Sequence, residues 1–245
     1  MSESRVALIT GAAHRLGAEI TRHLHRAGLR VLIHYRNSNA PADALAAELN
    51  AQRADSARTL TADLLDLAAI DALANAAVSA WGRVDVLINN ASTYYPTPIG
   101  EIASTQWDDL IGSNLRAPLF LAQALAPSLK AQRGSIVNMV DIHAEKPLPG
   151  HALYSVAKAG LAMLTRALAT ELSPEVRVNA VAPGIILWPE RELSDHEKSA
   201  MLERVALGRK GEPSDIAETV RFLALDAAYV TGQIVAVDGG RSLTH

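Results

Sequence analysis

Val6-Ala-Leu-Ile-Thr-Gly-Ala-Ala-His-Arg-Leu-Gly17 joins a run of four apolar residues to a turn that carries two glycines. The run has the length of a buried strand, and an Ala- and Leu-rich stretch with helical periodicity begins at Leu16. A strand that turns at glycine into a helix presents backbone amides and a helix amino end, which together can receive a phosphate group. We therefore expect the first strand-turn-helix unit of an α/β sheet here.

The same alternation continues along the chain. The apolar or β-branched runs that we predict as strands are 6–9, 29–34, 57–61, 84–89, 135–140, 177–182 and 234–237. The longer stretches that we predict as crossover helices are 16–26, 41–52, 67–80, 105–130, 152–171 and 213–225. Right-handed crossovers then give a single domain over residues 1–245, a doubly wound Rossmann-type α/β fold with a central parallel seven-stranded sheet and helices on both faces. The least regular stretch, 182–194, predicts a mobile substrate flap, which we place at about 183–206.

Composition narrows the classes of function. The chain has 245 residues, 49% hydrophobic and 20% charged, a globular balance without the long apolar stretch of a membrane span. A net charge of -3 offers no broad cationic face, so we expect a small-molecule partner and neither nucleic acid nor a membrane. The absence of cysteine excludes disulfides and thiolate catalysis, and the eight histidines lack metal-ligand spacing, so no metal is predicted. Residues 1–5 lack the features of a signal peptide, and we expect a cytoplasmic protein.

The end of the second predicted strand bears on cofactor choice. It runs into His34-Tyr35-Arg36-Asn37-Ser38, without the acidic residue that would bond the ribose hydroxyl of NAD. Arg36, with Ser38 and His34, offers a cation and hydrogen-bond donors to a 2′-phosphate, which favours NADPH. A solvated loop arginine is the alternative. Asp63, just beyond the third predicted strand, would suit the adenine edge.

Tyr154 and Lys158 are the candidate catalytic pair. Their i, i+4 spacing projects a phenol and an ammonium from the same face of a helix. The unperturbed pKa of a tyrosine is near 10, roughly three units above neutrality, and a nearby ammonium favours the ionised form. We therefore predict that Tyr154 is a general acid, although in other contexts such a pair lies on a surface.

Asp141 stands at the end of the fifth predicted strand, thirteen residues before Tyr154. In ketone reduction the carbonyl oxygen gains negative charge, which an ionised carboxylate beside it would repel. Reduction of a C=N bond makes the opposite demand, because the nitrogen must gain a proton. An adjacent acid can donate this proton through Tyr154, or it can stabilise a protonated ring. Asp141 therefore predicts a nitrogen heterocycle as substrate.

These motifs together resemble the short-chain dehydrogenase/reductase family. The TGxxxxxG turn at 10–17, the Asn-Asn-Ala-Ser segment at 89–92 and the Tyr154/Lys158 pair after the fifth predicted strand carry the resemblance, with Ser92 in place of the family's usual glycine. The finer resemblance is to pteridine reductases, and it also includes the segments 34–38 and 90–98 and the acid at 141.

The resemblance implies roles for several residues. Lys158 would stabilise the phenolate and hold the nicotinamide ribose, and Asn114 would organise a proton-relay water, with a buried hydrogen-bonding role as the alternative. Tyr94 would sandwich a pterin against the nicotinamide, with a loop aromatic packed on the core as the alternative, while Ser92 and Arg15 would bond the polar edge of the pterin.

The predicted catalytic residues are Asp141, Tyr154, Lys158 and Asn114. The predicted cofactor-binding residues are Gly11, His14, Arg15, Leu16, Gly17, His34, Arg36, Asn37, Ser38, Asp63, Leu64, Asn90, Ala91, Ser92, Tyr154, Lys158, Pro183 and Gly184.

The resemblance also implies a homotetramer built on the helices at 105–130 and 152–172. This sequence departs from the family pattern at three places: the sandwiching residue is usually phenylalanine, lysine usually stands at the place of His14, and the arginine of the second-strand loop appears here one place earlier. Trp188 covers substrate or lies in a subunit interface, and we assign it no role.

The leading hypothesis is NADPH-dependent reduction of a dihydropterin or a related pterin or folate. The alternatives are a carbonyl or 3-oxoacyl reductase of the same family and a non-catalytic NADPH-binding sensor, since a fold alone does not imply catalysis.

Overall fold

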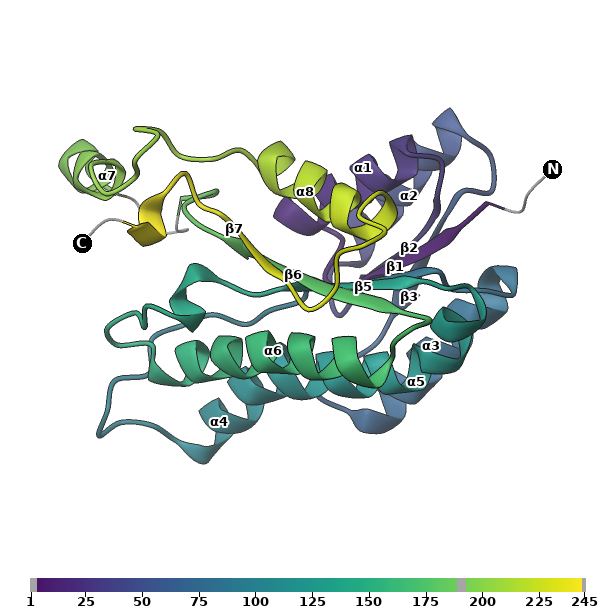
Figure 1. Ribbon diagram of the computed structural model, residues 1–245, viewed down its shortest axis with the longest axis horizontal. Coiled ribbons are helices and arrows are strands. Elements are labelled where there is room, and N and C mark those ends of the chain that lie inside the picture. The colour runs from purple at the N-terminus through teal and green to yellow at the C-terminus, as the bar shows by residue number, and fades with distance from the viewer. Residues whose placement is uncertain (1–3, 189–192, 244–245) are drawn as a thin grey trace.

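All seven predicted strands are present in the computed structural model, which describes residues 4–188 and 193–243. They form one parallel sheet in the order β3-β2-β1-β4-β5-β6-β7, which confirms the Rossmann-type fold (Figure 1). The order reverses between β1 and β4, and the carboxyl ends of strands at such a switch point border a crevice where ligands bind. The strands are β1 (Val6–Ile9), β2 (Arg30–Tyr35), β3 (Ala57–Thr61), β4 (Val86–Asn89), β5 (Ser135–Met139), β6 (Arg177–Pro183) and β7 (Ile234–Val237).

Helices cover both faces of the sheet (Figure 1). One layer consists of α1 (Arg15–Arg26), α2 (Asn39–Gln52) and α8 (Pro213–Leu225), and the other contains α3 (Leu67–Trp81), α5 (Ala117–Ala131) and α6 (Ala152–Glu171). Successive side chains of a strand point to opposite faces, so Ala7 and Ile9 enter the core under the first layer while Val6 and Leu8 enter the core under the second. Burial on both faces explains why the central strands β1 and β4 are almost continuously apolar, whereas the edge strand β3 is partly exposed and contains polar residues.

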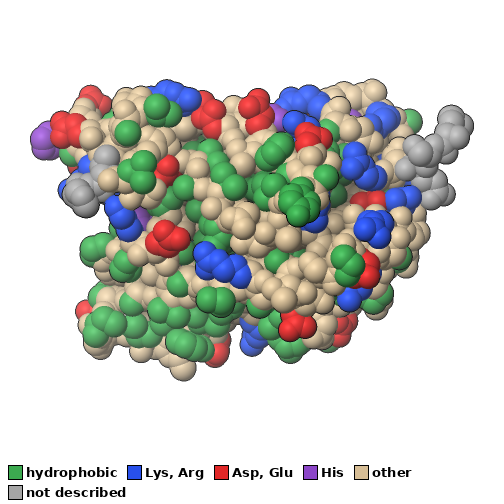
Figure 2. All heavy atoms as spheres, viewed as in Figure 1, with side chains coloured by type: hydrophobic (Ala, Val, Ile, Leu, Met, Phe, Trp, Pro, Cys, Tyr) green, Lys and Arg blue, Asp and Glu red, His purple; other side chains and the backbone are tan. Residues whose placement is uncertain are grey.

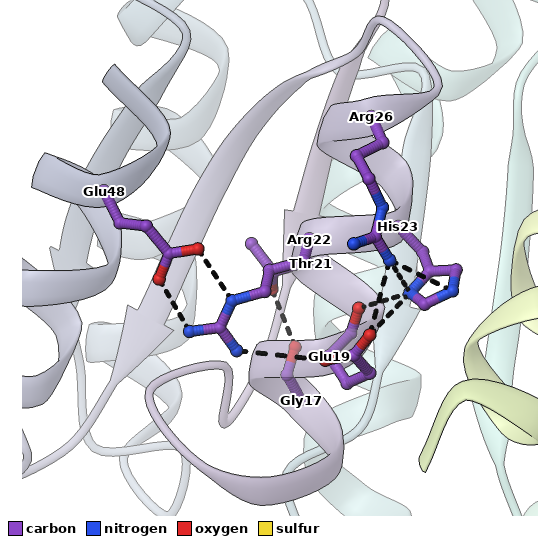
Figure 3. A network of polar contacts seen from close by, with 7 residues as sticks. All are labelled: Gly17, Glu19, Thr21, Arg22, His23, Arg26 and Glu48. Atoms are coloured by element: carbon purple, nitrogen blue, oxygen red, sulfur yellow. Dashed lines mark hydrogen bonds and ion pairs between the residues drawn. The ribbon is translucent and has the colours of Figure 1, made fainter. Parts of the chain in front are cut away.

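Ion pairs on the outer surface of the first layer tie α1 to α2 (Figure 3). Arg22 donates two hydrogen bonds to Glu48, at 2.9 and 2.7 Å. Arg26 and His23 contact Glu19 on α1 itself. Because exposed ion pairs contribute about 0–1 kcal/mol each, this network orients α1 more than it stabilises the fold.

The helix predicted over 105–130 is interrupted. The structure has α4 (Ser104–Ile111), then a π-helical turn at Gly112–Arg116, then α5. The amide of Ala117 bonds the carbonyl of Gly112, five residues earlier. Pro118 has no amide hydrogen and cannot bond the carbonyl of Asn114, so the regular ladder fails at this point and a wider turn replaces it.

The predicted flap contains a helix that we did not predict, α7 (Asp195–Leu202). Its start is a capping box in which Ser194 and Glu197 bond each other's backbone amides, at 3.2 and 2.9 Å. The four residues 189–192 of the flap lie outside the described residues, and its mobility stays a prediction. Two 3₁₀ turns, η2 (Ile142–Ala144) and η3 (Arg241–Leu243), follow β5 and β7. Within the described parts of the chain, no helix combines the length and apolar character needed to cross a membrane.

Candidate active site

Hydrogen bonds hold the glycine-bearing turn after β1 against the end of β4. The side-chain amide of Asn90 donates to the carbonyls of Thr10 and Gly11, at 2.9 and 3.0 Å. Gly11 has a φ of +60°, and a Cβ there would lie 2.9 Å from the Cα of Ala91. A Cβ on Gly17 would collide with the carbonyl oxygen of Gly11. Only glycine permits this close packing of the turn, so the two glycines are explained by backbone geometry.

The amino end of α1 opens into a cleft of about 420 Å³. His14 precedes the helix without a side-chain capping bond, and no acidic residue occupies its first turn. The next residue, Arg15, has a φ of 49°, in the left-handed region that non-glycine residues seldom adopt. An uncapped helix amino end of this kind fits a pyrophosphate. The predicted cofactor residues that line this first cleft are Gly11, His14, Arg15, Leu16, Gly17, His34, Arg36, Asp63, Leu64, Asn90, Ala91 and Ser92.

His34 lines the first cleft, but the structure does not favour the prediction that it helps to bind a 2′-phosphate. Its side chain is 2% exposed, and its Nδ1 accepts from the amide of Gly11 at 3.2 Å while its Nε2 faces the carbonyl of Ala62 at 3.2 Å. Burial lowers the pKa of His34 to about 4. The ring is therefore neutral near pH 7 and braces the glycine-bearing turn instead.

Arg36 lies at the rim of the first cleft and is exposed. No hydrogen bond or ion pair engages its guanidinium within residues 4–188 and 193–243. Asn37 and Ser38, which we predicted beside it, are not among the residues that line the cleft. Asp63 does line it, and its Oδ1 accepts from the amide of Leu65 at 3.0 Å.

Tyr154 and Asp141 are in direct contact. The phenol of Tyr154 donates to Oδ2 of Asp141 at 2.8 Å, while Oδ1 accepts from the amide of His143 at 2.8 Å and so caps η2. Lys158, one turn along α6 from Tyr154, donates to the carbonyl of Met139 at 2.8 Å. The strand β5, the turn η2 and the helix α6 thus place the predicted acid, phenol and ammonium in one site.

The expected effect of Lys158 on the phenol is not found. Burial raises the pKa of Tyr154 above its usual value, and the charge of Asp141 and the hydrogen bond to it act in the same direction, while a hydrogen bond from Ser92 acts against them. The nitrogen of Lys158 lies 5.6 Å from the centroid of the ring. Burial lowers the pKa of Lys158 itself to about 8, and the charge of Asp141 acts in the opposite direction. The phenol therefore holds its proton at neutral pH, as a proton donor must.

Asn114 lies in the π-helical turn and is fully buried. Its amide nitrogen donates to the carbonyls of Thr93 and Leu110, at 2.9 and 3.0 Å, and its oxygen accepts from the hydroxyl of Ser92 at 2.6 Å. The side chain of Asn114 thus holds the loop after β4 against the helix. This agrees with the alternative interpretation of Asn114 as a buried hydrogen-bonding residue. Its role in a water relay stays a prediction.

Tyr94 borders a second cavity of about 620 Å³. Its ring is 54% exposed, stacks on His151 with centroids 4.8 Å apart, and meets the ring of Tyr154 edge-on at 4.9 Å. The structure thus brings Tyr94 to the catalytic pair. The second cavity is lined by Arg15, Ser92, Tyr94, Asp141, Ile142, His143, Leu148, Tyr154, Gly184, Ile185, Leu187, Trp188, Met201 and Arg241.

A third cavity, of about 290 Å³, connects the other two, because it shares Arg15, Ser92 and Leu187 with both. Lys158, Pro183 and Gly184 line it together with Tyr154 and Asp141. The three cavities therefore adjoin one another, from the first cleft, lined by Arg36, to the second cavity, lined by Trp188.

Sequence analysis missed several lining residues. Leu65, Thr93, Ser113 and Leu187 line the first cleft, and His143, Met201 and Arg241 line the second cavity. The cap Ser194-x-x-Glu197 was a usable signal for the helix that carries Met201. Arg241 had no comparable signal, because only the return of β7 to the edge of the sheet brings it near Asp141. Among the described residues, no three His, Asp or Glu side chains cluster as metal ligands would.

A family model described as enoyl-(acyl carrier protein) reductase matches residues 11–242. The chain belongs to the short-chain dehydrogenase/reductase family. Members of this family are oxidoreductases that use a nicotinamide cofactor, and the first cleft described above fits that cofactor.

Two kinds of relative are similar to this chain at nearly the same identity. Pteridine reductase 1 of Leishmania tarentolae is 40% identical to it, over 98% of this chain and 97% of that protein. A 3-oxoacyl-[acyl-carrier-protein] reductase of Staphylococcus aureus is 37% identical, over 98% of this chain and 99% of that protein. The corresponding reductase of Synechocystis is 36% identical, over 97% of this chain and 96% of that protein. Identity alone does not separate a pterin from an acyl substrate.

Proposed function

We propose that this short-chain reductase uses NADPH to reduce a pterin ring, from the dihydro to the tetrahydro form, with oxidised pterin or dihydrofolate as further substrates. The observation that carries the proposal is the 2.8 Å hydrogen bond between the phenol of Tyr154 and the carboxylate of Asp141. The resemblance to pteridine reductase 1 supports it.

The charge of Asp141 supports a pterin substrate over a ketone substrate on electrostatic grounds. A ketone oxygen that approached Tyr154 would develop negative charge beside Asp141, which also lines the cavity. A ring nitrogen that becomes protonated develops positive charge, which the same carboxylate stabilises. The site therefore favours reduction of C=N over reduction of C=O.

The chain's own residues can be assigned to parts of this reaction. NADPH, when bound, supplies the hydride to a ring carbon. Tyr154 holds the proton that the neighbouring nitrogen needs, because a phenol is protonated at neutral pH. Tyr94, edge-on to Tyr154, would stack on the flat ring, and Ser92 and Arg15 would bond its polar edge.

NADPH rather than NADH is proposed because of Arg36. The exposed guanidinium at the rim of the first cleft suits a 2′-phosphate, and burial removes His34 from that task. We also propose a homotetramer and a cytoplasmic location, as expected above.

A panel of substrates tests the proposal. Purified protein and the variant Asp141→Ser are supplied with NADPH or NADH and with dihydrobiopterin, dihydromonapterin, dihydrofolate and a 3-oxoacyl ester. Serine can also cap η2, so the variant removes the charge and spares the turn. We expect pterin reduction with NADPH, a loss of about 10²–10⁴ in kcat/KM for pterin in the variant, and a gain in ketone reduction.

Activity only on the ketone, undiminished in Asp141→Ser, would contradict the proposal and favour a 3-oxoacyl reductase. Tight NADPH binding without turnover of any substrate would favour a sensor. As a control for folding, the binding of NADPH to Asp141→Ser is measured by fluorescence.

A further inference from the structure

We propose that His151 is a positioning residue, which holds the ring of Tyr94 in place for a flat heterocyclic substrate. The inference rests on the proposed function, in which Tyr94 stacks on the pterin ring. It adds to that reaction a residue that none of the sequence motifs contains.

The ring of Tyr94 depends on a neighbour for its position. It is 54% exposed and lies in the irregular loop after β4. A side chain that becomes immobilised only when a ligand binds weakens the binding, because its rotamer freedom is lost at that moment. A ring that is already held in position avoids this loss.

His151 supplies that support by stacking. The rings of Tyr94 and His151 have centroids 4.8 Å apart and planes that differ by 13°. This distance lies in the range of favourable ring pairs. The ring of Tyr154 stands at 79° to that of Tyr94, with centroids 4.9 Å apart. The stack therefore fixes an aromatic ring directly beside the proposed proton donor, and it leaves a substrate at most one face of Tyr94.

His151 is itself fixed by its neighbours in the chain. Its amide donates to the carbonyl of Leu148 at 3.1 Å, and its carbonyl accepts from the amide of Ser155 at 3.0 Å. Its Nδ1 lies 3.0 Å from the carbonyl oxygen of Pro149. Because a carbonyl oxygen can only accept, Nδ1 carries a proton and donates it. The orientation of the imidazole is thus set before any ligand binds.

The two loops that carry the stacked rings are bonded to each other. The amide of Thr97 donates to the carbonyl of Gly150 at 2.6 Å, and its hydroxyl accepts from the amide of Leu153 at 3.4 Å. Thr97 is 1% exposed and also forms an isolated bridge with His151. Backbone contacts therefore hold the loop of Tyr94 against the loop of His151.

Helix capping does not account for the side chain of His151. The residue directly precedes α6, a place where Ser, Thr, Asp and Asn are preferred because their side chains bond the free amides of the helix. The imidazole makes no such bond. His151 is also absent from the described residues that line the three cavities. We therefore expect it to act on the substrate through Tyr94.

A double-mutant cycle tests the inference. His151→Ala removes the stacked ring and His151→Phe keeps a flat ring, and each is made in the native protein and in Tyr94→Ala. The control is His196→Ala, which changes an exposed histidine of α7 that lines none of the three cavities. The measurements are kcat, KM and kcat/KM for dihydrobiopterin and KM for NADPH.

In His151→Ala we expect the KM for dihydrobiopterin to rise about three- to tenfold, with kcat and the KM for NADPH within about twofold of native. His151→Phe should restore most of the native KM, because a flat ring again stacks on Tyr94, and His196→Ala should keep the native values. In Tyr94→Ala the further change His151→Ala should have no effect on kcat/KM, since the ring through which His151 acts is gone.

An equal effect of His151→Ala in both backgrounds would overturn the inference, because His151 would then act without Tyr94. A lower kcat together with a higher KM for NADPH would mean that the start of α6 is displaced, and this result would overturn it as well. An unchanged KM for dihydrobiopterin would show that Tyr94 needs no support. If His151→Ala does not fold, as judged by circular dichroism, His151→Leu takes its place in the cycle.

Failure of the proposed function gives a different result. The native protein would then reduce no dihydropterin, and the ring of Tyr94 is followed directly by fluorine NMR of protein labelled with fluorotyrosine. The chain has five tyrosines, and the resonance of Tyr94 is the one that disappears in Tyr94→Phe. A narrower line for Tyr94 in His151→Ala, the sign of a freer ring, would still support its positioning by His151. A line of unchanged width would overturn it.

Discussion

Asp141 uses its two carboxylate oxygens for different tasks. Oδ1 caps the turn that follows β5, and Oδ2 accepts the proton of Tyr154 in a hydrogen bond. The first contact fixes the orientation of the side chain, so the second contact is fixed as well. A serine at this position could make either contact but would bring no charge, and the charge of Asp141 adds to burial in raising the pKa of the phenol.

The pH dependence of the reaction should depend on Lys158. Burial lowers its pKa to about 8, against about 10.4 in an unfolded chain, and the charge of Asp141 keeps it from falling further. The other role expected of Lys158 is to hold the nicotinamide ribose, and an ammonium donates stronger hydrogen bonds than a neutral amine does, so we expect kcat/KM to fall as pH rises through about 8. In Asp141→Asn the fall should begin at lower pH, because the stabilising carboxylate is gone.

The measurement is kcat/KM for a dihydropterin between pH 6.5 and 9.5, in native protein and in Asp141→Asn. A basic limb at the same pH in both proteins would show that the carboxylate does not act on Lys158. The lowered pKa of Lys158 also affects the stability of the fold. Between pH 8 and about 10.4 the unfolded chain binds more protons at Lys158 than the folded protein does, so the free energy of unfolding rises with pH in this range.

Among the elements, the π-helical turn at Gly112–Arg116 connects the fold to the site. It carries Asn114, whose side chain fastens the loop that contains Ser92 and Tyr94. Such wide turns interrupt the regular hydrogen bonding of a helix and occur frequently at functional sites.

Replacement of Asn114 by alanine should separate anchoring from proton relay. The carbonyls of Thr93 and Leu110 lose a buried donor, so we expect the free energy of unfolding to fall by about 1–3 kcal/mol, measured by urea denaturation. The KM for pterin should rise because the loop that bears Tyr94 is released. Gln123→Ala, on the exposed side of α5, is the control. If Asn114→Ala kept the stability and the KM of the native protein and only its kcat were lower, the result would instead support the water relay.

Some parts of the site could be predicted from the sequence and others could not. The glycines at 11 and 17 and the pair Tyr154/Lys158 could be predicted from their spacing and from the predicted elements that carry them. His34 could not, because its burial depends on the glycine turn and on the strand end at Ala62, which are distant in sequence. The same holds for Arg241, whose neighbours Asp141 and Met201 lie on other elements.

At the scale of the whole molecule, one face of the second helical layer carries exposed apolar side chains. Figure 2 shows hydrophobic groups gathered over α4 and α6. Val156 and Met163 on α6 are 55% and 62% exposed, and Trp107 on α4 is 50% exposed. Apolar groups gathered on one face are typical of an interface between subunits, which agrees with the proposed tetramer.

A charge on this face should dissociate the proposed assembly. We expect Met163→Glu, alone or with Val156→Glu, to shift the mass measured by light scattering from a tetramer to a smaller species. Leu67→Glu, at an exposed position on α3, should leave the mass unchanged. A native protein that is monomeric at working concentration would contradict the tetramer itself.

The order in which the chain supplies its cavity walls has a consequence for biosynthesis. Every residue that lines the first cleft precedes position 188, whereas the second cavity also needs Met201 and Arg241. On a ribosome the residues that line the nucleotide pocket are therefore synthesised well before the last residues that line the second cavity. A nascent chain would gain the complete lining of the second cavity only after Arg241 has been added.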